Sequence, residues 1–142
     1  MTGELFVDTG WFFALQVPDD RWHRVARESL ERTLRSGVQL VTTNQVVGET
    51  YSLLLKTHGQ AAAWRFLDAL ERSTRLEQVH VDEKTEREAY GILRRFRDQA
   101  FSFVDGTSFA VMRQRKARLA LAFDRHFAAA GFSRVPLDAP VP

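Results

Sequence analysis

The sequence contains no cysteine. A disulfide-stabilised fold, a zinc site built from thiolates and a cysteine nucleophile are therefore all excluded. The chain also lacks any apolar run near the roughly 18 residues that a membrane-spanning helix needs. Its first residues show neither the basic start nor the apolar stretch of a secretory signal peptide. We therefore predict a cytoplasmic protein that has no membrane partner.

Lysine is scarce as well, since Lys56, Lys84 and Lys116 are the only lysines and arginine supplies the other basic side chains. A guanidinium group binds phosphate in a bidentate geometry that an ammonium group lacks. The composition thus allows a nucleic-acid partner, although the codons of a GC-rich genome explain it equally well. A P-loop, a GxGxxG fingerprint and a GxSxG elbow are missing too, which leaves P-loop chemistry, dinucleotide binding and acyl transfer without support.

The 142 residues, 44% of them hydrophobic, fit one domain with its own core, spanning residues 1–142. Hydrophobic periodicity and turn residues predict alternating strands and helices. The predicted strands are 4–8, 38–42, 76–81, 119–123 and 133–137. The predicted helices are a short one from Thr9, a long one from an Asp19 or Asp20 cap to Ser36 and Gly37, one from an Asn44 cap to His58, and then 60–73, 83–97, 102–115 and 124–131. This alternation predicts an α/β fold, with a twisted parallel sheet of four to five strands flanked by helices on both faces.

Four acidic residues stand at matching places in this predicted sheet. Asp8 ends the first strand, Asp124 follows LALAF, Glu49 lies early in the helix after the second strand, and Asp105 lies in the first turn of a later helix. Ligand sites of open parallel sheets lie at the carboxyl ends of the strands, so we expect these carboxylates to meet at that edge. Clustered carboxylates repel one another, and Mg²⁺ or Mn²⁺ relieves that repulsion.

Most of these acids also have a purely structural interpretation. Asp8 and Asp124 fit helix N-caps. Ser102 and Asp105 fit the spacing of a capping box in which aspartate takes the usual place of glutamate. Glu49 is harder to explain in this way, because its surroundings predict a mostly buried helix face. The joint placement of the four acids, rather than any one of them, indicates a metal site.

Four segments together resemble the PIN-domain nucleases, and most of all the VapC-type toxins of bacterial toxin–antitoxin pairs. The segments are VDTG (Val7–Gly10), TTNQVVGETYSLL (Thr42–Leu54), FSFVDGTSFAVM (Phe101–Met112) and LAFDRHFAAAGF (Leu121–Phe132). The resemblance covers essentially the whole chain and implies a PIN-like domain that cleaves RNA with Mg²⁺ or Mn²⁺. It also implies a homodimer and a cognate antitoxin whose tail covers the site. By this resemblance the metal-binding acids are Asp8, Glu49, Asp105 and Asp124, and the supporting polar positions are Thr9 and Asn44.

Two positions depart from the family pattern. Gly10 stands where many relatives carry serine, and we expect it to loosen the first turn of its helix. His126 replaces an acid that many relatives carry close after the residue equivalent to Asp124. We expect this loss to weaken binding of a second ion, which leaves the number of ions open. The other histidines, His23, His58 and His80, have no closely spaced metal-binding partner.

The reaction predicted from these residues is hydrolysis of RNA phosphodiester bonds by a water that the metal activates. We expect Asp8 and Asp105 to bind the ion most directly. Glu49 and Asp124 are expected to bind it directly or through water, and one of them to accept a proton. In-line attack leaves a 5′-phosphate and a 3′-hydroxyl and does not use the ribose 2′-hydroxyl.

Two further surfaces are candidates for partners. Arg125 adjoins Asp124, and Arg113 begins a basic cluster after the Asp105 helix, so both are predicted contacts of the RNA backbone. The alternative for the cluster is a solvated helix end that complements the helix dipole. The helices between Asn44 and Ser73 carry much apolar surface, which is either core or a dimer or antitoxin interface.

Two other functions are compatible with the acids. One is a different magnesium-dependent phosphoryl-transfer enzyme on a doubly wound sheet, although VDTG lacks the second aspartate that a dehalogenase-like phosphatase usually has after its first strand. The other is a non-catalytic RNA-binding or interaction module whose acids only cap helices. Stabilisation by added metal distinguishes these cases, because an ion that binds the folded state stabilises it.

Overall fold

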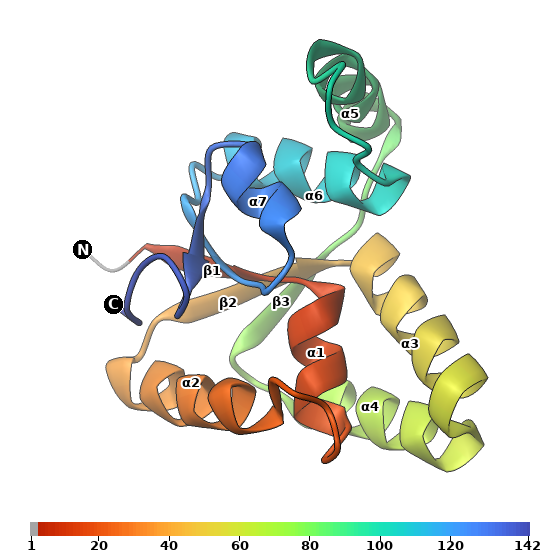
Figure 1. Ribbon diagram of the computed structural model, residues 1–142, viewed down its shortest axis with the longest axis vertical. Coiled ribbons are helices and arrows are strands. Elements are labelled where there is room, and N and C mark those ends of the chain that lie inside the picture. Colours follow the sequence, from red (N-terminus) through yellow and green to blue (C-terminus); the bar gives the residue numbers. More distant parts are fainter. Residues whose placement is uncertain (1–2) are drawn as a thin grey trace.

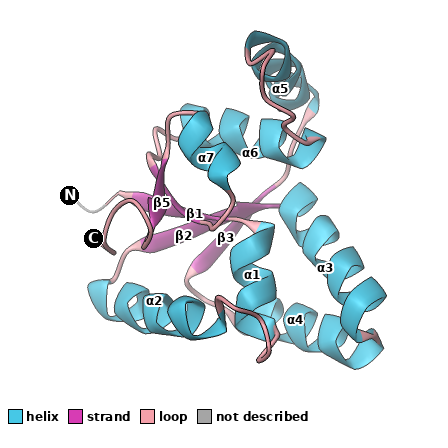
Figure 2. Ribbon diagram, in the orientation of Figure 1, coloured by secondary structure: helices cyan, strands magenta, loops and turns pink. Residues whose placement is uncertain are grey.

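A single five-stranded sheet runs through the computed structural model, which describes residues 3–142 (Figures 1 and 2). The strands are β1 (Glu4–Val7), β2 (Gln39–Thr43), β3 (Leu76–Val79), β4 (Leu119–Leu121) and β5 (Ser133–Val135). Every neighbouring pair is parallel, and the order is β3-β2-β1-β4-β5. The predicted α/β fold and parallel sheet are confirmed. Because β2 and β4 lie on opposite sides of β1, the strand order reverses at β1, where such sheets form their sites.

Within residues 3–142, seven helices connect the strands and cover the sheet. They are α1 (Thr9–Gln16), α2 (His23–Ser36), α3 (Asn44–His58), α4 (Gln60–Arg72), α5 (Glu83–Arg95), α6 (Phe103–Gln114) and α7 (Arg125–Ala129). Figure 1 shows α1, α2 and α4 on one side of the sheet and α5, α6 and α7 on the other. Helix α3 packs against α4 and also contacts α1 and α6. No helix within residues 3–142 is both long and apolar enough to cross a membrane.

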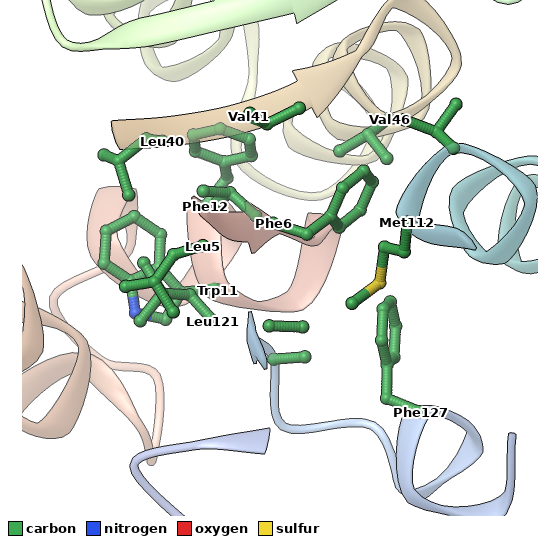
Figure 3. Packing of buried hydrophobic residues seen from close by; sticks show 14 of the residues in the cluster. Leu5, Phe6, Trp11, Phe12, Leu40, Val41, Val46, Met112, Leu121 and Phe127 are labelled. Atoms are coloured by element: carbon green, nitrogen blue, oxygen red, sulfur yellow. The ribbon is translucent and has the colours of Figure 1, made fainter. Parts of the chain in front are cut away.

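The core has two halves because successive residues of a strand point to opposite faces of the sheet. Leu5 of β1 lies beside Trp11 of α1, whereas Phe6 points toward Met112 of α6 and Phe127 of α7 (Figure 3). The ring centroids of Phe6 and Phe127 are 6.4 Å apart. Since helices cover both faces, β1 is buried throughout its apolar part, which explains its unbroken apolar sequence.

The start of α2 differs from the prediction. The helix begins at His23 and not directly after Asp19 or Asp20. The carboxylate of Asp20 accepts a hydrogen bond from the backbone N–H of Trp22 at 2.9 Å, and it therefore stabilises the turn before the helix instead of capping it. The predicted end is confirmed, because Gly37 adopts the left-handed conformation with φ 75°.

The last two strands are shorter than predicted and end at Leu121 and Val135. Phe123 has already left the sheet, and its ring stacks on Trp22 with the centroids 4.8 Å apart. After β5, Pro136 has no N–H to donate to a sheet. The early end of β4 matters for function, because it allows Asp124 to open α7 at the edge of the sheet.

Candidate metal-binding active site

The four predicted acids line one pocket at the carboxyl edge of the sheet. The pocket has a volume of about 310 Å³ and is lined by Asp8, Thr9, Gly10, Glu49, Ala100, Ser102, Asp105, Asp124 and His126. The acids come from the residue after β1, the second turn of α3, the first turn of α6 and the segment after β4. Residues that are up to 116 positions apart in the sequence thus meet because parallel strands end at the same edge.

Asp8 is the most perturbed of these acids. It is only 6% exposed. Asp8 occupies the predicted N-cap position of α1, but its side chain makes no capping hydrogen bond there. Burial first, and repulsion from Asp105, Glu49 and Asp124 in addition, raise the pKa of its carboxyl group from 3.8 to about 7, against the lowering effect of a hydrogen bond from the Thr9 backbone. A cation bound among these carboxylates would favour the ionised form of Asp8.

Asp105 has two roles in the structure. Its backbone N–H donates to the Ser102 hydroxyl at 3.0 Å, while its Oδ2 accepts from the Ser102 backbone N–H at 3.0 Å. The predicted capping box is therefore confirmed. The same Oδ2 lies 2.9 Å from Nδ1 of His126, across the pocket. Capping thus holds the 7% exposed Asp105 in a fixed position and still leaves its carboxylate facing the site.

Asp124 and Glu49 form the more open side of the pocket. Asp124 caps α7 as predicted, since its Oδ1 accepts the backbone N–H of His126 at 2.8 Å, but its side chain stays 42% exposed. Glu49 is exposed, and it forms no ion pair within the part of the chain that the structure describes. These two carboxylates can therefore exchange with water more readily than Asp8 and Asp105.

The two predicted supporting residues act at different places. Thr9 lines the pocket, and its hydroxyl donates to the carbonyl of Val46 at 3.5 Å and so links α1 to α3. Asn44 neither lines the pocket nor caps α3, because the cap is Thr43. Its Oδ1 instead accepts the backbone N–H of Val81 at 2.8 Å and ties the start of α3 to the segment after β3. Asn44 therefore positions the helix that carries the glutamate of the site.

Gly10 does not prevent α1 from forming, because the helix runs from Thr9. A Cβ atom at Gly10 would lie 3.9 Å from Oδ2 of Asp8, an ordinary contact distance. The pocket therefore has room for the serine that many relatives carry.

His126 is a residue of the pocket that was not predicted as a metal ligand. Its imidazole lines the pocket, and its nitrogen and the carboxylate oxygens of Asp105 and Asp124 all lie within 4.8 Å of one another. The position of His126 in the sequence could have indicated this placement. A side chain that replaces the acid at this position lies in the first turn of α7 and faces the same pocket.

The predicted RNA-contacting arginines lie outside this pocket. Arg125 is exposed on α7 next to Asp124. Arg113 lies at the opposite end of α6 from Asp105, beside a second pocket of about 370 Å³ that Lys116 and Arg118 also line. Arg113, Lys116 and Arg118 form no ion pair among residues 3–142.

The chain belongs to the PIN domain family, whose model matches residues 5–133. Among known proteins it is similar to the 23S rRNA-specific endonuclease VapC20 of Mycobacterium tuberculosis, in strains CDC 1551 / Oshkosh and ATCC 25618 / H37Rv. Each is 40% identical to it over 132 residues, which is 92% of this chain and 97% of the relative. The crystal structure of M. tuberculosis VapC20, described as a Sarcin-Ricin loop cleaving toxin, matches with a TM-score of 0.80 and 38% identity, over 90% of this chain and 95% of that one. The predicted family and the predicted likeness to VapC-type toxins are confirmed.

Proposed function

We propose that this protein is a metal-dependent endoribonuclease and the toxin of a type II toxin–antitoxin pair. The observation that carries the proposal is the convergence of Asp8, Glu49, Asp105 and Asp124 on one pocket of a PIN domain. Similarity to a 23S rRNA-specific endonuclease over nearly the full length of both chains supports 23S rRNA as the target.

The residues of the pocket fit Mg²⁺ or Mn²⁺. Carboxylate oxygens are the ligands that these ions prefer, and the raised pKa of Asp8 indicates a cluster that a cation would stabilise. Asp8 and Asp105 would hold the ion, with Glu49 and Asp124 completing the site. Such an ion supplies a Lewis acid that offsets charge on the scissile phosphate and makes water nucleophilic near neutral pH.

The acidic side chains of the pocket would have different roles in the reaction. Asp105 is held by its capping box, so the ion and the phosphate would meet a fixed carboxylate. Glu49 and Asp124, which are more exposed, are placed to orient the attacking water and to accept its proton. The products are a 5′-phosphate and a 3′-hydroxyl.

The positions of the basic residues support an extended contact with RNA. Arg125 lies beside the acidic pocket and would bind a phosphate near the cleaved bond. Arg113 lies eight positions after Asp105 on α6, a rise of about 12 Å at 1.5 Å per residue. A chain of several nucleotides would therefore reach from the acids to the second, basic pocket.

Apolar surfaces support the proposed protein partners. Trp64 on α4 is 52% exposed, and Leu53 and Leu55 on α3 are also exposed, which supports a homodimer through these helices. A separate apolar pocket of about 230 Å³ lies between α1, α2 and α4. Trp11, Phe12, Leu30 and Leu70 are among the residues that line it, so it would accept apolar side chains of an antitoxin segment. A cytoplasmic location follows from the proposed target.

Cleavage of purified ribosomes, with mapping of the new 23S rRNA ends, tests the proposal. The wild type is expected to produce one dominant cut with a 5′-phosphate in Mg²⁺ or Mn²⁺ and none in excess EDTA. Asp8→Asn is expected to lose the cut, whereas the control Asp19→Asn, at an exposed position in the turn before α2, keeps it. Equal cleavage in EDTA, or full activity of Asp8→Asn, would contradict the proposed function.

A further inference from the structure

We propose that His126 is a nitrogen ligand of the ion at this site, and that it shifts the site's preference from Mg²⁺ toward transition-metal ions such as Mn²⁺. The inference rests on the proposed function to the extent that the four acids hold a cation. It concerns a residue that stands where many members of the family carry an acid.

The imidazole lies where a ligand is needed. Nδ1 of His126 is 2.9 Å from Oδ2 of Asp105 and 3.6 Å from Oδ1 of Asp124. Two neighbouring ligand atoms of an octahedral ion with bonds of about 2.1 Å lie about 3.0 Å apart. The observed separations are close to this value, so small side-chain movements would place all three atoms around one ion. Binding through Nδ1 uses the neutral imidazole that carries its hydrogen on Nε2.

The imidazole is also held in place by its surroundings. Its backbone N–H donates a hydrogen bond to the Asp124 carboxylate in the first turn of α7. Its ring packs edge-on against Phe101, with the centroids 5.2 Å apart, and Phe101 packs in turn against the buried Phe109. The side chain is 20% exposed. His126 is therefore pre-positioned at the site and is not a mobile surface histidine.

The nature of the donor atom decides which ion is preferred. Mg²⁺ is bound in proteins almost entirely through oxygen, and it keeps several of its waters. Divalent transition-metal ions accept imidazole nitrogen, with affinity that rises from Mn²⁺ through Co²⁺ to Ni²⁺. Replacing an acid by histidine exchanges an oxygen donor for a nitrogen donor and removes one negative charge. The lost charge weakens binding of both ions, whereas the exchange of donor atom weakens Mg²⁺ binding more than Mn²⁺ binding.

A different role for His126 is that of a hydrogen-bond donor which only orients Asp105. In that case the imidazole hydrogen stays on Nδ1, and no nitrogen reaches the ion. The two roles differ in a property that can be measured without any RNA, namely whether nitrogen is bonded directly to the metal.

The test is pulsed electron paramagnetic resonance of the full-length protein loaded with Mn²⁺, together with calorimetric titration of Mn²⁺ and Mg²⁺. Three proteins are compared: the wild type, His126→Asp, and the control His80→Asp, which makes the same change at an exposed position that does not line the pocket. The wild type and the control are expected to show the hyperfine coupling of a directly bound nitrogen, and His126→Asp is expected to lack it. The ratio of Mn²⁺ to Mg²⁺ affinity is expected to fall in His126→Asp, on the order of tenfold, because a nitrogen donor that suits Mn²⁺ is exchanged for a carboxylate that suits Mg²⁺.

Absence of directly bound nitrogen in the Mn²⁺-loaded wild type would overturn the inference, as would an unchanged affinity ratio in His126→Asp or a failure to bind Mn²⁺. The presence of bound nitrogen and the cleavage of RNA are measured separately, so the two proposals can fail independently. Metal-dependent RNA cleavage without bound nitrogen would refute only the role of His126. Bound nitrogen in a protein that cleaves no RNA would refute only the endoribonuclease proposal.

Discussion

Replacing Asp8 with asparagine is expected to stabilise the ion-free protein above pH 7 even though it abolishes activity. In the unfolded chain the carboxyl group has its ordinary pKa of 3.8, and in the folded protein burial raises this pKa to about 7. Between these values the folded protein holds a proton that the unfolded chain has lost. The free energy of unfolding therefore falls as the pH rises from about 4 to about 7, and it levels off above that.

The size of this effect follows from the pKa difference. Each pKa unit corresponds to 1.36 kcal/mol, so an increase of about three units costs the folded protein about 4 kcal/mol at pH 8. That is a large fraction of the 5–15 kcal/mol by which domains are usually stable. Asparagine has nearly the same shape, still accepts a hydrogen bond and carries no charge. Asp8→Asn should therefore regain much of this free energy at pH 8 and little at pH 4.

Urea unfolding in EDTA at several pH values measures the difference. The wild type and Asp8→Asn are compared at each pH, with the exposed Asp68→Asn as the matched control. The stability difference between wild type and Asp8→Asn should grow from pH 4 to pH 7. A difference that is independent of pH, or an asparagine variant less stable than the wild type at pH 8, would refute the assignment of an uncompensated buried acid.

Two other predictions concern the same region. Because an ion must displace the proton of Asp8, the apparent affinity for Mn²⁺ in calorimetry should rise with pH by up to about tenfold per unit below pH 7 and flatten above it; a flat profile from pH 5 to 8 would contradict this. Gly106→Ala should lower the free energy of unfolding by about 1–3 kcal/mol, because the new Cβ would lie 2.9 Å from Cγ of Leu93 on α5 and overpack this contact. Urea unfolding with metal present checks it, and an unchanged midpoint would show that Leu93 moves aside freely.

The fold and the four acids could be predicted because their signals are local and repeat along the chain. Each strand is a short apolar run, and Asp8 and Asp124 come directly after such runs, so the geometry of parallel sheets brings them together. The capping box at Ser102 and Asp105 is likewise contained within four residues, and the structure has it as predicted.

The errors have non-local causes. Asn44 is a residue type that favours helix N-caps, but its side chain accepts a hydrogen bond from the backbone of Val81, which lies 37 residues further along the chain. Asp20 is also a residue type that favours N-caps, but its side chain accepts a hydrogen bond within the turn before α2. The place of His126 depends on the direction in which α7 leaves the sheet, which no periodicity encodes. Residue type alone therefore indicates the loss of an acid at this position, but not the contact of the His126 imidazole with Asp105.

The assembly of the site from distant segments has a consequence for the time at which the protein becomes active. Asp8 is synthesised more than a hundred residues before Asp124 and His126. The strand β4 that leads to them fills the place beside β1, so the pocket is incomplete until β4 has been made and has paired. A growing chain therefore carries no finished nuclease pocket before that step. For an enzyme whose proposed target is ribosomal RNA, this order of assembly delays cleavage until β4 has joined the sheet.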